Sequence, residues 1–112
     1  MAWSTPHVTE GRLFYWHETG WISHPVGADS WYRWLAQPAT RLFYIREAAM
    51  TVRREPVKGK QAPYWYAYRK RQGILAKVYL GRSEHLTPAR LTTAAQHLDA
   101  RQNPADTPAA RP

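Results

Sequence analysis

The stretch that most constrains the fold of this 112-residue chain runs from Tyr64 to Gly81, where two β-rich segments flank one short turn. The first segment, YWYAYRKR (64–71), places aromatic residues directly beside consecutive cations, and the second is ILAKVYLG (74–81). Between them stands Gln72-Gly73, and glycine supplies the positive φ that a two-residue hairpin turn requires. The stretch therefore predicts an antiparallel hairpin closed at Gln72-Gly73.

The two faces of this hairpin differ, because successive side chains of a strand point to opposite faces of its sheet. With Arg71 paired to Ile74, the residues of one face are Trp65, Ala67, Arg69, Arg71, Ile74, Ala76, Val78 and Leu80. The residues of the other face are Tyr64, Tyr66, Tyr68, Lys70, Leu75, Lys77 and Tyr79. Lysine is almost never fully buried without a partner, so we expect the second face to be open.

A helix is predicted directly after the hairpin. Thr87 can cap it, and Pro88 suits its first position, where the missing N–H costs nothing. An apolar stripe at helical spacing follows, made of Leu91, Ala94, Ala95 and Leu98. We expect this helix to end at Asn103-Pro104 and to cover the aliphatic hairpin face, with Arg69 and Arg71 extending past its edge.

The N-terminal half is aromatic and predicts further strands and a short helix. The segment RLFYWHETGWI (12–22) indicates two strands around a turn at Glu18-Thr19-Gly20. A helix follows, capped by Asp29 or Ser30 and stopped by Pro38. Three further segments are TRLFYIR (40–46) and AMTVRREPV (49–57), which predict strands, and KGKQAP (58–63), which predicts a loop.

These elements predict a small α+β domain, with an antiparallel sheet of about three to five strands and a C-terminal helix packed on one face. A short aromatic helix lies in the N-terminal half. A chain of this length suits one domain, which we expect over residues 1–102. Within it we expect an aromatic part (12–47) and a basic part of sheet and helix (49–101), followed by a disordered tail (103–112).

Composition argues against several classes of protein. The chain has no cysteine, and its five histidines are scattered, so we expect neither a disulfide nor a metal or other cofactor. It has no glycine-rich phosphate loop and no close carboxylate pair, so we expect no enzymatic activity. Without an apolar run long enough to span a membrane, a cytoplasmic, nucleoid-associated protein is expected.

The positive charge is concentrated in one block. The net charge of the chain is +8, and residues 41–82 hold eleven Lys and Arg against Glu47 and Glu55, a net +9. A surface that binds a polyanion would concentrate charge in this way. The block contains the hairpin, so the charge and the open tyrosine face belong to the same element.

The stretch YWYAYRKRQGILAKVYLGRSEHLTPARL (64–91) resembles a segment near the N-terminus of large bacterial LuxR-type, ATP-binding transcriptional regulators. The segments SWYRWL (30–35) and TVRRE (51–55) fit the same resemblance. More loosely, the order of three strands and a helix resembles the arm-site DNA-binding domains of tyrosine recombinases, which insert a three-stranded sheet into the major groove. Both resemblances imply a DNA-binding role in bacteria or a mobile element. No ATPase or recombinase catalytic region follows here, so no enzymatic activity is implied.

We therefore expect a small regulatory or accessory protein that binds nucleic acid, foremost double-stranded DNA, with the exposed face and turn of the hairpin. The major groove is about 12 Å wide and admits a two-stranded ribbon. The candidate nucleic-acid-binding residues are Arg53, Arg54, Lys58, Lys60, Tyr66, Tyr68, Arg69, Lys70, Arg71, Lys77, Tyr79 and Arg82. An alternative ligand is RNA or single-stranded nucleic acid, on whose bases the tyrosines would stack.

A second hypothesis is a protein-interaction module. Five of the six tryptophans precede residue 35, and Trp, Tyr and Arg dominate the energetics of protein interfaces. The candidate interaction residues are Trp16, Trp21, Trp31 and Trp34. Two alternatives stay open at this point: the tryptophans form a core, or the aromatic half covers the tyrosine face.

Overall fold

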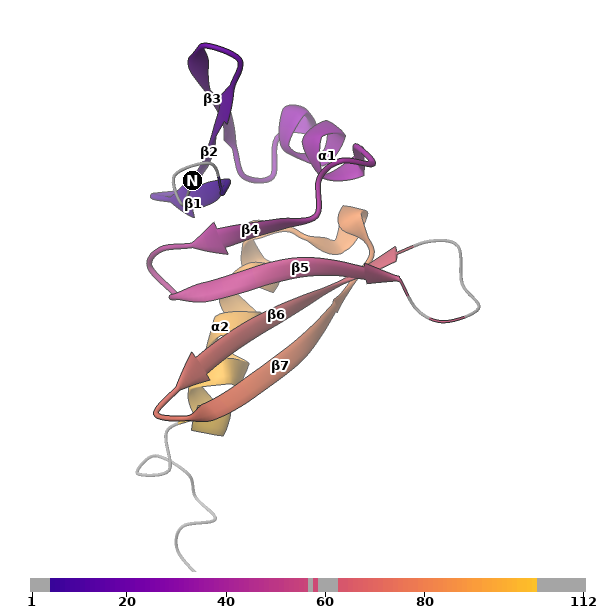
Figure 1. The fold of residues 1–112 in the computed structure, drawn as a ribbon. Coiled ribbons are helices and arrows are strands. Elements are labelled where there is room, and N and C mark those ends of the chain that lie inside the picture. Colours follow the sequence, from indigo (N-terminus) through magenta and orange to yellow (C-terminus); the bar gives the residue numbers. More distant parts are fainter. Residues whose placement is uncertain (1–4, 57, 59–62, 103–112) are drawn as a thin grey trace, which may run out of the picture.

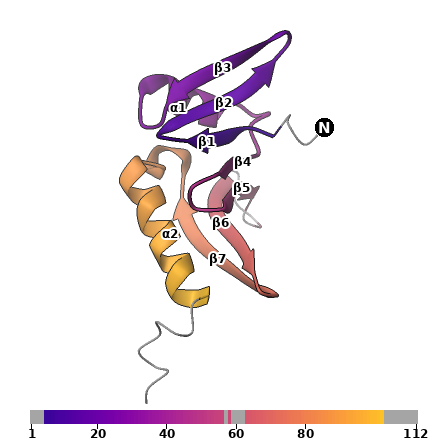
Figure 2. The same cartoon turned by 90° about the vertical axis from the view of Figure 1, so that its left-hand side faces the viewer.

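A computed structural model describes residues 5–56, 58 and 63–102 of the chain. These residues form one seven-stranded sheet and two α-helices. Both helices lie on the same side of the sheet (Figure 1 and Figure 2). The elements are β1 (His7–Thr9), β2 (Arg12–His17), β3 (Gly20–Pro25), α1 (Asp29–Ala36), β4 (Leu42–Ile45), β5 (Met50–Pro56), β6 (Pro63–Arg71), β7 (Ile74–Gly81), a 3₁₀ turn (Ser83–His85) and α2 (Pro88–Gln102). The predicted α+β class is confirmed, with more strands than expected.

The sheet consists of two antiparallel meanders joined side by side. Its strand order is β3-β2-β1-β4-β5-β6-β7, and the junction is a parallel pair in which His7 and Val8 of β1 face Tyr44 and Ile45 of β4. The predicted purely antiparallel sheet is therefore wrong at this one junction. The sequence analysis missed β1 because it has only three residues, and so did not foresee the connection that it makes.

Two of the hairpin turns have central residues with positive φ. Gln72 and Gly73 have φ of 53° and 81°, and Arg71 pairs with Ile74, so the predicted turn and register of β6 and β7 are confirmed. Glu10 and Gly11 have φ of 51° and 77° and close the turn between β1 and β2 in the same way. Positive φ at both central residues matches the right-handed twist of the flanking strands.

One hydrophobic core lies between the helices and the sheet. The Trp31 ring of α1 meets Phe43 of β4 edge to face at 5.1 Å, and Phe43 lies 5.7 Å from Trp65 of β6. The Trp31 indole N–H also donates to the carbonyl of Leu86, after the 3₁₀ turn, at 2.9 Å. This core buries both Trp31 and Trp34, so neither is available to a partner as the interaction hypothesis required.

The ends of the helices agree with the sequence in part. The Thr87 hydroxyl accepts the backbone N–H of Arg90 at 3.1 Å, which confirms the predicted cap of α2. The cap position of α1 is Ala28, so the predicted Asp29 or Ser30 cap is wrong. Asp29 instead begins the helix, where its carboxylate complements the helix dipole. The predicted stop at Asn103-Pro104 and the predicted tail (103–112) lie outside the described residues.

Candidate nucleic-acid interface

The sheet face that points away from α1 and α2 is open across the described residues, and the tyrosines of the hairpin lie on it. In Figure 1, α2 lies behind β6 and β7. Tyr79 and Leu75 of the open face are 51% and 64% exposed, whereas Ala67 and Val78 of the helix face are buried. The N-terminal strands extend the sheet sideways, so the alternative in which they cover the tyrosines is wrong.

The tyrosines form a contiguous cluster across β6 and β7. Tyr66 pairs with Tyr79 in the register, and their rings meet edge to face at 5.4 Å. Tyr64 lies 5.9 Å from Tyr79, and Tyr68 lies 6.5 Å from Tyr66. The Lys77 ammonium lies over the Tyr66 ring, 4.3 Å from its centre. The cluster thus presents ring edges, hydroxyls and a cation on one surface.

One carboxylate lies within this cluster. The Tyr68 hydroxyl donates a hydrogen bond to Glu55, and Lys77 Nζ lies 3.4 Å from Glu55 Oε1. The hydrogen bond from Tyr68 lowers the pKa of Glu55, and interaction with the Tyr68 hydroxyl raises the pKa of Lys77. Lys77 therefore remains a cation, but Glu55 partly neutralises it.

Two other cations of the open face are exposed and form no ion pair among the described residues. Arg53 of β5 pairs with Tyr66 in the register, and Lys70 of β6 pairs with Leu75 next to the turn. Both side chains are exposed and make no hydrogen bond or ion pair within residues 5–56, 58 and 63–102. The charge of Arg53 adds to the hydrogen bond from Tyr68 in lowering the pKa of Glu55. Both cations are accessible to an anionic ligand.

Three further candidates are exposed, and one of them, Arg71, lies on the helix side of β6. Arg82 follows β7, and Lys58 lies in the connection between β5 and β6. Arg71 has a side chain 42% exposed, and its guanidinium lies 3.8 Å from Asp99 of α2. Lys60, another candidate, lies outside the described residues.

Arg69 does not belong to the open surface, which corrects the expectation that it extends past the edge of the helix. Its side chain is 4% exposed, and its guanidinium donates to Asp99 and to the carbonyl of Ala48, each at 2.5 Å. The reason is the length of α2, whose last residue, Gln102, donates to the carbonyls of Arg69 and Ile74 at 2.6 and 2.7 Å. The helix reaches the hairpin turn and leaves Arg69 no route to solvent on that side.

Arg54 is also used within the fold. Its guanidinium donates to the carbonyls of Leu35 and Gln37 at 2.9 and 2.7 Å, and it lies 5.5 Å from the centre of the Trp65 ring. Burial lowers the pKa of Arg54. Strand alternation contained the signal, since Arg54 has the same parity in β5 as buried Val52 and Met50.

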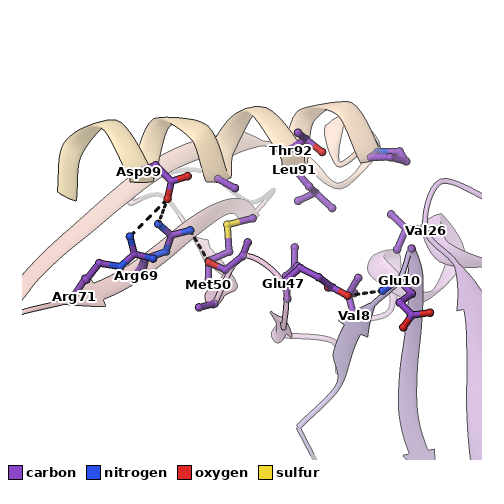
Figure 3. A pocket seen from close by; sticks show the side chains of 16 residues that line it. Val8, Glu10, Val26, Glu47, Met50, Arg69, Arg71, Leu91, Thr92 and Asp99 are labelled. Carbon is purple, nitrogen blue, oxygen red and sulfur yellow. Dashed lines mark hydrogen bonds and ion pairs between the residues drawn. The ribbon is translucent and has the colours of Figure 1, made fainter. Parts of the chain in front are cut away.

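The helix side of the sheet has a hollow of about 720 Å³ between α2 and the turn joining β4 to β5, shown in Figure 3. Its middle is apolar, with Met50 and Leu91. The charged groups Arg69, Arg71, Asp99 and Glu47 of its lining have partners within the fold. Arg69 and Arg71 meet Asp99 at one end, and Glu47 accepts hydrogen bonds near Glu10 at the other. The hydrogen bond from Thr9 lowers the pKa of Glu47. With both signs present, this hollow does not suit a polyanion.

Comparison with known proteins gives no functional assignment, so the function is inferred from the residues of the site. No protein-family model, no curated protein and no solved structure matches this chain. Within the described part of the chain, no helix has the length and apolar character needed to cross a membrane. The same residues contain no group of three or more His, Asp or Glu side chains placed to hold a metal ion.

Proposed function

We propose that this protein binds nucleic acid, foremost duplex DNA, through the open face of β5, β6 and β7. The observation that carries the proposal is the separation of the cations between the two faces. On the helix face, Arg54 and Arg69 are bound to carbonyls and a carboxylate of the fold. On the open face, the side chains of Arg53 and Lys70 are exposed beside the tyrosines and form no hydrogen bond or ion pair among the described residues.

The arrangement fits the chemistry of a nucleic-acid backbone. Exposed Lys and Arg neutralise phosphates, and tyrosine hydroxyls donate hydrogen bonds to phosphate oxygens. A β-ribbon fits a major groove of about 12 Å, and the turn beside Lys70 is the part of the ribbon that would enter it. The residues of the proposed interface are Arg53, Lys58, Tyr66, Tyr68, Lys70, Lys77, Tyr79 and Arg82. Arg71, another sequence candidate, lies beside Asp99 on the helix side and is not among them.

The test is a titration of the protein with blunt duplex DNA, single-stranded DNA and RNA at several salt concentrations. Neutralising about five phosphates predicts a slope of log affinity against log salt of about −4 to −5 for duplex DNA. Arg53→Ala and Lys70→Ala should each weaken binding and reduce the slope by about one. Arg33→Ala is the matched control, because Arg33 is an exposed cation on α1, on the other side of the sheet.

The proposal fails if duplex DNA is not bound at low salt, or if the Arg33 variant weakens binding as much as the Lys70 variant. A flat salt response would also overturn it. If single-stranded DNA or RNA binds more tightly than duplex DNA, the ligand assignment changes to that nucleic acid. The proposed binding surface stays the same.

A second candidate function is contact with a protein partner through the β2–β3 hairpin at the N-terminal end of the sheet. Trp16 and Trp21 are 39% and 52% exposed there, which supports this candidate for these two of the four tryptophans. Their rings pack edge to face at 5.4 Å. Loss of a co-purifying partner on Trp21→Ala, with DNA binding unchanged, would favour this function.

A further inference from the structure

The open face also has a hollow of about 650 Å³ beyond the proposed interface, between the N-terminal strands and β4. Its lining includes His7, Trp21, Leu42, Tyr44, Arg46 and Thr51. The register places them on one face, since His7 lies opposite Tyr44 and Tyr44 lies opposite Thr51. The hollow therefore opens on the same side of the sheet as the tyrosine cluster.

Aromatic rings form its walls and are held in position by their neighbours. His7 stacks on Phe14 at 5.6 Å and meets the edge of Trp21 at 6.0 Å. Trp21 is 52% exposed and Tyr44 is 37% exposed, so solvent reaches both rings. An exposed ring that lines a hollow suits a flat ligand, because stacking makes contact with a whole ring face.

Charge and position decide which flat ligand fits. Arg46 is the one Lys, Arg, Asp or Glu in the described lining of the hollow, so the hollow favours an anion beside the ring. Thr51 of the lining also lies opposite Tyr68 in the register, so the hollow is continuous with the proposed interface. The distance from β4 to β6 is two strand spacings, about 10 Å.

We propose that this hollow stacks an unpaired nucleobase on the exposed ring of Trp21, with Tyr44 beside it and the adjoining phosphate on Arg46. The inference rests on the proposed function and names its ligand more closely as a duplex with a single-stranded extension. The duplex would occupy β5 to β7, and the first unpaired nucleotides would cross β4 into the hollow. Stacking tolerates any base, so no sequence preference is expected in the extension.

The experiment compares a blunt duplex with the same duplex carrying a four-nucleotide extension at the 5′ or the 3′ end, made of DNA or of RNA. One unpaired position holds 2-aminopurine, whose fluorescence falls when it stacks. For the parent protein the extension should tighten binding about tenfold and quench the probe. Trp21→Ala and Tyr44→Ala should lose this gain and the quenching while binding the blunt duplex as the parent does. Lys70→Ala should weaken both ligands equally.

Two further variants distinguish loss of the aromatic ring from misfolding of the protein. Trp21→Phe and Tyr44→Phe keep a ring and should retain most of the gain, and thermal melting checks the fold of every variant. If the blunt duplex binds and the extension adds nothing, the inference is wrong and the proposed function stands. If the single strand binds through Trp21 and the duplex does not bind at all, the hollow is supported and the duplex interface is wrong. If no oligonucleotide binds, both fail, and self-association or a protein partner that depends on Trp21 becomes the assignment of the hollow.

Discussion

At the scale of single residues, Arg69 and Lys70 carry the same charge on adjacent positions of β6 and point to opposite faces of the sheet. Arg69 is buried against Asp99 and the carbonyl of Ala48, whereas Lys70 is exposed on the open face. Although they are adjacent in the sequence, the two residues have different roles. Arg69 holds β6 to α2, and Lys70 is accessible to a ligand.

Replacement of these two residues should separate stability from binding. Arg69→Leu should lower the free energy of unfolding by about 1–3 kcal/mol, because it removes charged hydrogen bonds and leaves the Ala48 carbonyl without its donor. Lys70→Ala should change the stability by no more than about 0.5 kcal/mol. Urea denaturation of both variants measures the difference. Equal stability of the two variants would contradict the assignment of Arg69 to the fold.

Glu55 makes the same open face sensitive to pH. The hydrogen bond from Tyr68 lowers the pKa of Glu55 below its ordinary value of 4.5. A carboxylate with a lowered pKa in the folded state contributes stability above the unfolded-state pKa, and this contribution is lost as pH falls through the folded-state pKa. Glu55→Gln should therefore flatten the acid limb of the stability curve below about pH 4.5. It should also tighten DNA binding, because it frees Lys77 from its counter-charge. Weaker binding by this variant at neutral pH would argue against the proposed surface.

At the scale of elements, the β6–β7 hairpin depends on the backbone conformation of its turn. A Cβ atom added at Gly73 would meet nothing within 4 Å, so the cost of Gly73→Ala comes from its φ of 81° alone. We expect a loss of about 1 kcal/mol. Gly20 also has open space around it but lacks a positive φ, so Gly20→Ala is the matched control and should be near neutral. Thermal denaturation of both variants tests this, and equal melting temperatures would contradict it.

At the scale of the whole molecule, one chain of aromatic contacts joins the two meanders. Trp31 contacts Phe43 and donates to Leu86, and Phe43 contacts Trp65. The parallel β1–β4 pair adds the backbone bonds Tyr44 N–H to Pro6 and Arg46 N–H to Val8, both at 2.9 Å. The halves share both a core and a sheet, so we expect them to unfold together.

Trp31→Ala should destabilise the whole molecule by about 3–5 kcal/mol, because it opens a large cavity where the halves meet. Unfolding followed by near-UV and far-UV circular dichroism should give coincident transitions for the parent. Trp21→Ala is the control and should cost much less, since that ring is 52% exposed. Two separate transitions, with only the N-terminal one shifted by Trp31→Ala, would show that the meanders fold independently.

The hairpin, its turn at Gln72-Gly73, its two faces and the cap of α2 could be predicted from the sequence alone. These features depend on local physics: the φ that a residue tolerates, the alternation of a strand, and a hydroxyl three residues before a backbone N–H. The α+β class followed from the same local signals.

Which cations are exposed, and how far the sheet extends, depends on tertiary contacts. The burial of Arg69 depends on where α2 ends against the hairpin, and that of Arg54 depends on carbonyls near the end of α1. The parallel β1–β4 junction and the hollow beside it join residues more than thirty positions apart, such as His7 and Tyr44. Propensity and periodicity describe neighbours along the chain, so they cannot specify contacts that form when distant segments pack together.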